Sequence, residues 1–306
     1  MRILVTGGAG FIGSHIVDAL LAKGHDVVVL DDLSSGSVKN LPRRIRFIKL
    51  DVRSNNVATL FMDEHFDAVY HLAAQMDVRK SVADPRFDAS VNIIGGLNIL
   101  ECCAKYDVKK VIFASTGGAI YGEQDYFPAD EKHPCRPLSP YGVAKLSFEH
   151  YLFYYKEVYG IDYVSLRFAN IYGPRQNPHG EAGVVAIFAT KFLNGEQPVI
   201  NGDGKQTRDY VYVGDIVDAN LKALDYPETG IFNLGTGIET DVVALFRKIR
   251  DLSGSQCEEK HGPAKKGEQL RSVLDNSHAK NILGWEPRVS LDRGLQETVE
   301  YFKVQK

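Results

Sequence analysis

The stretch "ILVTGGAGFIGSH", residues Ile3–His15, predicts the fold of this chain. An apolar, β-branched run leads into a turn that contains Gly7, Gly10 and Gly13, and apolar residues then recur on one face of a helix. In a strand–turn–helix of this kind, one glycine permits the tight turn, one lets the backbone approach a pyrophosphate, and one lets the helix lie close to the strand. The start of the helix offers free N–H groups and partial positive charge to an anion.

An acidic residue follows at the distance that a dinucleotide site requires. Asp31 lies 18 residues after Gly13, at the tip of the second predicted strand. A carboxylate there accepts hydrogen bonds from a ribose diol and repels a 2′-phosphate, so the sequence favours NAD over NADP. Asp32 is a second candidate, with a solvated side chain as the alternative. A structural turn without a ligand also remains open.

Two further strand ends are expected to contribute, because ligands lie across the carboxyl ends of such sheets. In "LDV", Asp51 would accept from the adenine amino group, with Val52 beside it. In "HLAAQ", small residues after His71 would lie against ribose and phosphate. The predicted cofactor contacts therefore include Phe11 and Ile12 of the first helix, Val52, Leu72, Ala73, Ala74 and Gln75.

Short apolar runs alternate with helical patterns, which predicts a doubly wound, parallel α/β (Rossmann) sheet covered on both faces. The predicted strands are Ile3–Thr6, Val27–Leu30, Ile45–Leu50, Ala68–Leu72, Val111–Ser115 and Tyr163–Phe168. The first predicted helix starts near Ile12. The other predicted helices cover 85–105, 141–159, Val184–Leu193, Val242–Leu252 and Leu291–Phe302.

The regular alternation of strand and helix patterns ends after about Gly173, where long polar loops begin. We expect a dinucleotide-binding domain over residues 1–173 and a smaller, mixed α/β substrate domain over residues 174–306. Asp209–Val213 and Gly230–Leu234 are further predicted strands, with a return to the first sheet left open. Trp285 is expected to anchor the packing of the smaller domain.

Composition narrows the class of protein. The net charge of −3 gives no reason to expect a nucleic-acid or membrane partner. Four cysteines without metal-ligand spacing favour neither a disulfide framework nor a metal site. No apolar run reaches the roughly 18 residues that a membrane span needs, and the chain begins directly with the predicted fold. We therefore expect a cytoplasmic protein.

The pair Tyr141 and Lys145 in "YGVAK" indicates acid–base chemistry. Residues four apart share a helix face, and an ammonium near a phenol lowers the phenol's pKa. Bringing a tyrosine from about 10 to about 7 requires roughly 4 kcal/mol, which the lysine and a cationic nicotinamide together could supply. Tyr106 and Lys110 have the same spacing, but that pair straddles a predicted helix end and a strand and is read as chance.

These motifs together resemble the extended short-chain dehydrogenase/reductase superfamily and, within it, the UDP-glucose (UDP-galactose) 4-epimerases. The resemblance covers nearly the whole chain through "GGAGFIGSH", "DDLSSG", "HLAA", "YGVAK", "LRFANIYGPRQ", "GDGKQTRDYVYVGDIV" and "FNLGTG". It implies an isomerase that interconverts UDP-glucose and UDP-galactose with tightly held NAD. Separately, the aromatic residues of "FEHYLFYYKEVYG" recur at helical spacing, which favours a core or a subunit interface, and we expect a homodimer that pairs this helix and the one before it across a two-fold axis.

The resemblance also implies roles for particular residues. Cofactor contacts fall on Gly7, Gly10, Gly13, Asp31, Asp51, Asn92 and Lys145, with Tyr141 facing the nicotinamide. Substrate contacts fall on Thr116, Gly117, Asn170, Val185, Arg208 and Arg271. The arginine forks suit phosphate oxygens. Surface ion pairs are the alternative reading for both arginines.

"STGGAIYG", residues Ser115–Gly122, departs from the family pattern. The family presents a serine or threonine four residues before the tyrosine of "YG", and that position here is Gly117. Thr116, Ser115 or a water bound by the Gly117 backbone could replace the hydroxyl. Related dehydratases and decarboxylases carry acidic residues just after this point, whereas Gly118 and Ala119 cannot move a proton, so the reaction is expected to stop at reversible oxidation.

Three other readings stay open from the sequence. The enzyme could epimerise another UDP-sugar, such as an N-acetylhexosamine, a glucuronate or a pentose. It could be an NAD-dependent nucleotide-sugar oxidoreductase with net turnover and exchangeable cofactor. A nucleotide-sensing regulator on the same fold is disfavoured by the presence of Tyr141 and Lys145.

Overall fold

A seven-stranded parallel sheet forms the centre of the molecule. The computed structural model describes residues 1–178, 183–264 and 269–305. The strand order is β10-β6-β5-β4-β1-β2-β3, and every neighbouring pair is parallel. The predicted parallel, doubly wound sheet is therefore confirmed. The strands are β1 (Arg2–Thr6), β2 (Asp26–Asp31), β3 (Arg46–Lys49), β4 (Ala68–His71), β5 (Lys110–Thr116), β6 (Asp162–Phe168) and β10 (Gly230–Leu234).

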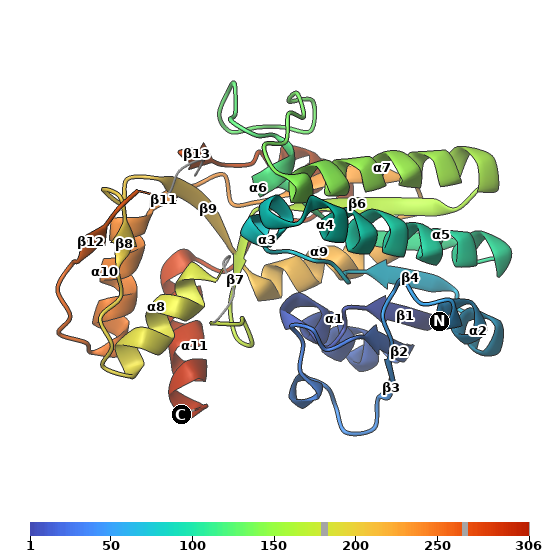
Figure 1. Cartoon of the computed structure of the whole chain (residues 1–306), viewed down its shortest axis with the longest axis horizontal. Coiled ribbons are helices and arrows are strands. Elements are labelled where there is room, and N and C mark those ends of the chain that lie inside the picture. Colours follow the sequence, from blue (N-terminus) through green and yellow to red (C-terminus); the bar gives the residue numbers. More distant parts are fainter. Residues whose placement is uncertain (179–182, 265–268, 306) are drawn as a thin grey trace.

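Helices cover both faces of this sheet (Figure 1). On one face, α1 (Phe11–Ala22) and α9 (Val213–Asp225) contribute Ile16 and Ile216 to a core that includes Ile3 of β1. On the other face, the core is formed with α2 (Asn56–Glu64), α5 (Gly96–Lys105) and α7 (Pro140–Tyr159). Both faces of the strands are buried, which explains why their sequences read as continuous apolar runs.

The helix predicted over residues 85–105 consists of three joined segments. These are α4 (Pro85–Ala89), the π-helical turn η2 (Ser90–Gly95) and α5. A π-helical turn rotates the side chains that follow it, and such turns are frequent at functional sites. Three short elements complete this part of the chain: η1 (Val38–Asn40), α3 (Val78–Ala83) and α6 (Gly117–Ile120).

The second part of the molecule is built on smaller sheets beside the first (Figure 1). The strands β11 (Glu239–Asp241), β9 (Thr207–Tyr212) and β13 (Arg271–Ser272) form one sheet, which β7 (Asn170–Tyr172) joins through β9. A separate pair joins β12 (His261–Gly262) to β8 (Ile200–Asn201). The helices around them are α8 (Val184–Leu193), α10 (Val242–Ser253) and α11 (Leu291–Val304).

The structure corrects or completes the sequence analysis at three points. Of the two strands that could return to the first sheet, β10 does so beside β6, whereas β9 belongs to the second sheet. Helices α2 and α9 were not predicted. Trp285, expected to anchor the smaller domain, instead lies in the core of the large sheet beside η3 (Ala279–Leu283), where its Nε1 donates to the Asp215 carbonyl at 2.7 Å.

Candidate active site

The glycine turn after β1 has the shape that a pyrophosphate requires. Gly7 has a φ of +69°, and a Cβ there would lie 2.6 Å from the amide nitrogen of Ala73. A Cβ on Gly13 would lie 2.2 Å from the Gly7 carbonyl oxygen. Gly10 is the N-cap of α1, and among the described residues no side chain caps the start of this helix. The first N–H groups of α1, including those of Phe11 and Ile12, therefore remain for an anion.

Asp31 lies at the carboxyl end of β2 against this turn. One carboxylate oxygen accepts from the Ala9 N–H at 2.9 Å and the other from the Leu33 N–H at 2.8 Å. Burial raises the pKa of Asp31, and these two N–H groups act in the opposite direction. The neighbouring Asp32 is exposed and accepts from the Ser34 N–H. The structure thus brings Asp31, and not Asp32, into the buried edge of the crevice.

The residues assigned to adenine lie after β3. Asp51 is paired with Arg53 at 2.6 Å, and the hydrogen bond from that guanidinium lowers the pKa of the carboxyl. Val52 is 4% exposed and packs against Gly95, whose added Cβ would lie 2.7 Å from a Val52 methyl. Asp51 therefore already has a cationic partner in this structure.

A hydrogen-bonded cluster fixes the end of β4, where Leu72, Ala73 and Ala74 run into Gln75. Asn92, on the π-helical turn, accepts from the Gln75 N–H and donates to the Gln75 carbonyl, both at 2.9 Å. Its amide also donates to Asp88 at 3.0 Å. Asp88 is 1% exposed, and its Oδ2 has no hydrogen-bond partner. Sequence reasoning missed Asp88, although its place four residues before Asn92 on a helix was visible.

Tyr141 and Lys145 lie together on the first turns of α7. The Lys145 Nζ is 5.8 Å from the centroid of the Tyr141 ring and donates to the Ala114 carbonyl of β5 at 2.8 Å. The helix starts at this point because Ser139 caps it by accepting from the Gly142 N–H, and Pro140 occupies the first turn. The pair therefore faces the ends of the central strands.

Burial shifts the pKa values of both members of this pair. Burial lowers the pKa of Lys145 to about 8, while Asp88 and Glu149 act to raise it. Burial raises the pKa of Tyr141, and Asp88 adds to the increase. The protein chain without NAD therefore does not lower the pKa of Tyr141, and the expected lowering by Lys145 together with a cationic nicotinamide stays a prediction. Any charge that stabilises the phenolate must offset burial as well.

At the end of β5, the two candidate hydroxyls point to different places. Ser115 is 2% exposed and donates to the buried Glu149 at 2.7 Å, which speaks against direct contact with a substrate. Thr116 is the N-cap residue of α6 and is half-buried. A Cβ on Gly118 would lie 3.9 Å from both the Thr116 hydroxyl and the Asn170 side-chain oxygen, so these two groups border the same small space.

The remaining substrate candidates lie in the second part of the molecule. Arg208, on β9, is half-buried and donates to the Thr207 carbonyl at 2.7 Å. Arg271, on β13, is paired with Glu239 at 2.6 Å and lies over the ring of Phe127. Val185 is buried in the core beneath the second sheet. The ion pair considered for Arg271 therefore exists, with Glu239 as its partner.

The doubly wound sheet, with its glycine turn and the tyrosine–lysine pair at its strand ends, places this chain among the dinucleotide-binding Rossmann enzymes. A model of the "NAD dependent epimerase/dehydratase family" matches residues 3–235, and the chain belongs to this family, whose cofactor is NAD.

Three UDP-glucose 4-epimerases are similar to this chain over nearly their whole length. The UDP-glucose 4-epimerase of Mycolicibacterium smegmatis is 45% identical, with 99% of each chain covered. The crystal structure of the Thermotoga maritima UDP-glucose 4-epimerase with UDP-glucose has 50% identity and a TM-score of 0.98, covering 100% of this chain and 99% of that one. The Thermus thermophilus UDP-glucose 4-epimerase in complex with NAD has 46% identity and a TM-score of 0.95, with 99% of each chain covered.

None of the helices in residues 1–178, 183–264 and 269–305 is long and apolar enough to cross a membrane. Within the same ranges, no group of histidine, cysteine and acidic side chains is arranged to hold a metal ion.

Proposed function

We propose that this protein is an NAD-dependent UDP-glucose 4-epimerase, which interconverts UDP-glucose and UDP-galactose. The observation that carries the proposal is the full-length likeness to enzymes of that name, with the tyrosine–lysine pair at the strand ends. NAD, when bound, would supply the acceptor for hydride from C4 of the sugar and the donor for its return to the opposite face. The residues that would hold it are the glycine turn, Asp31 and the cluster around Asn92.

Tyr141 is the proposed general base and acid. As a phenolate it takes the proton of the sugar 4-hydroxyl, and it gives the same proton back in the second half of the reaction, so no proton is gained or lost. Lys145 stabilises the phenolate by its charge while its ammonium is oriented by the Ala114 carbonyl. Thr116 is the proposed hydrogen-bonding partner of the reacting oxygen, in place of the side chain that Gly117 lacks.

Asn170, Arg208 and Arg271 are the proposed contacts of the substrate diphosphate. Holding the nucleotide while the 4-keto sugar turns over about its phosphate linkage lets one site serve both hydride transfers. Arg271 must exchange its contact with Glu239 for phosphate oxygens, or share it, because the guanidinium is already hydrogen-bonded at 2.6 and 2.9 Å. Gly118 and Ala119 supply no acid or base beside the sugar, which favours epimerisation over dehydration.

We also propose that the working unit is a homodimer in the cytoplasm. Aromatic and aliphatic side chains are exposed on α7, with Phe153 at 57% and Val158 at 56%, and Ile94 of the neighbouring π-helical turn is exposed at 58%. Two such helix faces could pair across a two-fold axis. All four cysteines are free thiols, which a reducing compartment maintains.

The first test is conversion without added cofactor. Purified protein incubated with UDP-galactose should form UDP-glucose with no net NADH, and UDP-N-acetylgalactosamine in a parallel reaction reports the substrate range. Tyr141→Phe should abolish conversion while the protein still carries its NAD. Tyr106→Phe is the matched control, since it removes a hydroxyl four residues before another lysine, Lys110, and should leave the rate unchanged. Full activity in Tyr141→Phe would contradict the assignment of the base.

A further inference from the structure

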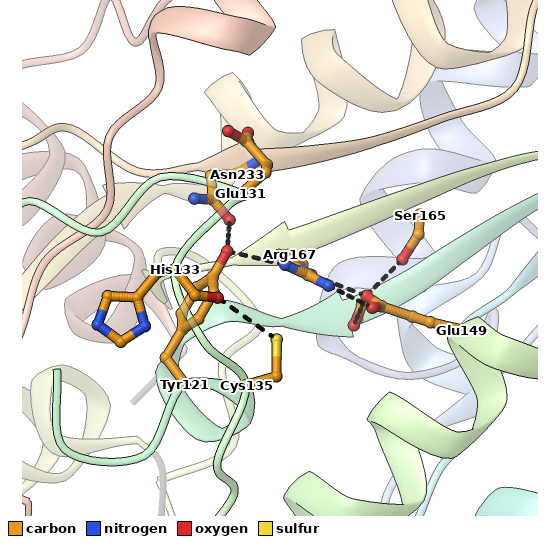
Figure 2. Close-up of polar contacts among 9 residues, drawn as sticks. Tyr121, Glu131, His133, Cys135, Glu149, Ser165, Arg167 and Asn233 are labelled. Atoms are coloured by element: carbon orange, nitrogen blue, oxygen red, sulfur yellow. Dashed lines mark hydrogen bonds and ion pairs between the residues drawn. The ribbon is translucent and has the colours of Figure 1, made fainter. Parts of the chain in front are cut away.

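A buried carboxylate lies on the same helix as the tyrosine–lysine pair, with no role in the chemistry proposed so far. Glu149 follows Lys145 by four residues on α7, and its side chain is 3% exposed. It accepts hydrogen bonds from the Ser115 hydroxyl at 2.7 Å and the Ser165 hydroxyl at 2.8 Å. Arg167 donates to both of its oxygens, at 3.0 and 2.6 Å (Figure 2). Glu149 is therefore fixed from several directions.

These contacts attach the helix to the sheet at the strand ends. Tyr141, Lys145 and Glu149 are spaced by four residues, so they lie along one side of α7, with about 6 Å of axial rise between successive members. Lys145 bonds the carbonyl of Ala114, and the next residue of β5, Ser115, bonds Glu149. Any sliding or rotation of α7 against β5 would have to break both contacts together.

Arg167 extends the attachment to the turn that follows Thr116. Ser115 of β5 and Arg167 of β6 are direct partners in the parallel register, so both present their side chains to α7. Arg167 also donates to the Tyr121 hydroxyl at 2.9 Å, and that hydroxyl donates to Asn233 of β10 at 2.7 Å (Figure 2). The same network thus holds α7, three neighbouring strands and the turn after β5.

We propose that Glu149 is a positioning residue of the reaction: through Ser115, Ser165 and Arg167 it fixes Tyr141 and Lys145 against the end of β5 and keeps a negative charge near the lysine ammonium. Glu149 touches no substrate or cofactor in this role. The inference rests on the proposed function, because its consequence is measured in the epimerisation itself.

The charges that face Lys145 define the electrostatic part of this role. Asp88 approaches from α4 and Glu149 from α7, and both raise the pKa of Lys145 against the larger effect of burial. His71, on β4, is fully buried, and its pKa is lowered to about 3 by burial and by Lys145, so it is neutral near pH 7. Tyr141 is the remaining titratable neighbour on α7 itself. Removing the Glu149 charge should therefore make Lys145 lose its proton at a lower pH.

Glu149→Gln in the full chain, with its NAD, tests the proposal. Gln preserves the size of the side chain and removes its charge. Because small displacements of reacting groups are costly, kcat for UDP-galactose should fall by about 10- to 100-fold, with KM changed by less than about twofold. The alkaline limb of the kcat–pH profile should also move to lower pH. If Glu149 had only a structural role, its loss would neither move the alkaline limb of the kcat–pH profile nor lower kcat while leaving KM nearly unchanged.

Two further variants separate positioning from loss of stability. Glu64→Gln is the matched control: Glu64 is also a buried glutamate, it pairs with Arg2 and Arg46, and it lies at the end of α2 away from α7. It should lose stability with kcat and the pH profile unchanged. The double variant Glu149→Gln with Arg167→Met removes both members of the buried pair, which should restore much of the lost stability, because no buried charge is left unpaired. It should still show the reduced kcat and the displaced limb.

The outcomes distinguish this inference from the proposed function. A wild-type protein that does not convert UDP-galactose contradicts the proposed function and the inference with it. An active wild type beside a Glu149→Gln variant of unchanged kcat and pH profile contradicts the inference alone. If Glu149→Gln fails to fold, the double variant decides, and a return of kcat and the alkaline limb to wild-type values in it would overturn the proposal.

Discussion

Gly117 stands where the resemblance leads one to expect a serine or threonine, and Leu274 fills the space beside it. A Cβ at this position would lie 2.4 Å from a methyl group of Leu274, which is 1% exposed. A serine or threonine at 117 would therefore displace a packed leucine that itself comes from the second part of the molecule. The space that a hydroxyl-bearing side chain at position 117 would need is therefore occupied by Leu274.

The lowered pKa of Lys145 predicts the direction in which this residue makes kcat depend on pH. Burial lowers the pKa of Lys145 to about 8, so the ammonium that stabilises the phenolate is present below that pH and lost above it. We expect kcat to fall as the pH rises through about 8, measured with saturating UDP-galactose. Tyr141 would have the opposite effect, because deprotonation of a base raises the rate with increasing pH. A kcat that keeps rising from pH 7 to pH 10 would contradict the role of Lys145.

At the residue scale, local patterns were predictable from the sequence and tertiary contacts were not. The glycines and the Tyr141–Lys145 spacing are sequence-local, because a turn and one helical repeat determine them. Asp88 comes close to Lys145 only when α4 packs against α7. Glu149 lies one helical repeat from Lys145, but its partners lie on two strands that the sequence alone does not place beside it. Gly117 could be recognised as unusual, but its neighbour Leu274 is 157 residues further along the chain.

Helix α7 serves two purposes on two sides. The side that carries Glu149 and Phe148 is buried against the sheet, whereas Phe153, Tyr154 and Val158 are exposed. An exposed apolar surface of this kind on a structured helix is typical of a contact with another chain. The predicted start and end of this helix agree closely with the structure, because Ser139, Pro140 and Gly160 are strong terminal residues.

The exposed face of α7 gives a prediction about assembly. Phe153→Glu places a charge at the centre of the proposed dimer contact, so the particle mass should fall from twice the 34.0 kDa chain to a single chain. Light scattering after gel filtration measures this. Met62→Glu, at a 52% exposed position on α2, is the control and should remain dimeric. A wild-type protein of one chain mass, or a dimeric Phe153→Glu, would contradict the proposed homodimer.

Helix α9 shows where the sequence patterns fell short. The residues of α9 were not predicted as a helix, although Ile216, Ala219 and Ala223 recur at helical spacing and are fully buried. The strand β9 ends at Tyr212, and α9 begins at the next residue without a loop that would have separated them. The strand-like run "DYVYV" therefore concealed the helix start.

For the whole molecule, the two expected parts interleave along the chain. After β7 and β9 have built the second sheet, α9 and β10 return to the large sheet, and η3 later packs against it as well. A single domain boundary near residue 173 therefore marks only the first passage of the chain from the large sheet to the second sheet. Alternation of strands and helices was enough to predict the large sheet, whereas the pairing of β10 with β6 joins segments more than 60 residues apart and had no local signature.

This interleaving also positions the substrate candidates. Asn170 begins β7 directly after β6, and β7 pairs with β9, which carries Arg208. Arg271 lies on β13, which pairs with Thr207 and Arg208 of β9 in the same sheet. The three proposed diphosphate contacts therefore come from one sheet that adjoins the end of the large one.

The most direct test of the account is to follow the hydrogen at C4. UDP-galactose labelled with deuterium at C4 is converted in ordinary water without added cofactor, and the UDP-glucose formed is analysed by mass and NMR spectroscopy. If hydride leaves and returns within one site while Tyr141 carries only the hydroxyl proton, the deuterium stays at C4 of the product. Hydrogen from water at C4, or deuterium recovered in released NADH, would contradict the account.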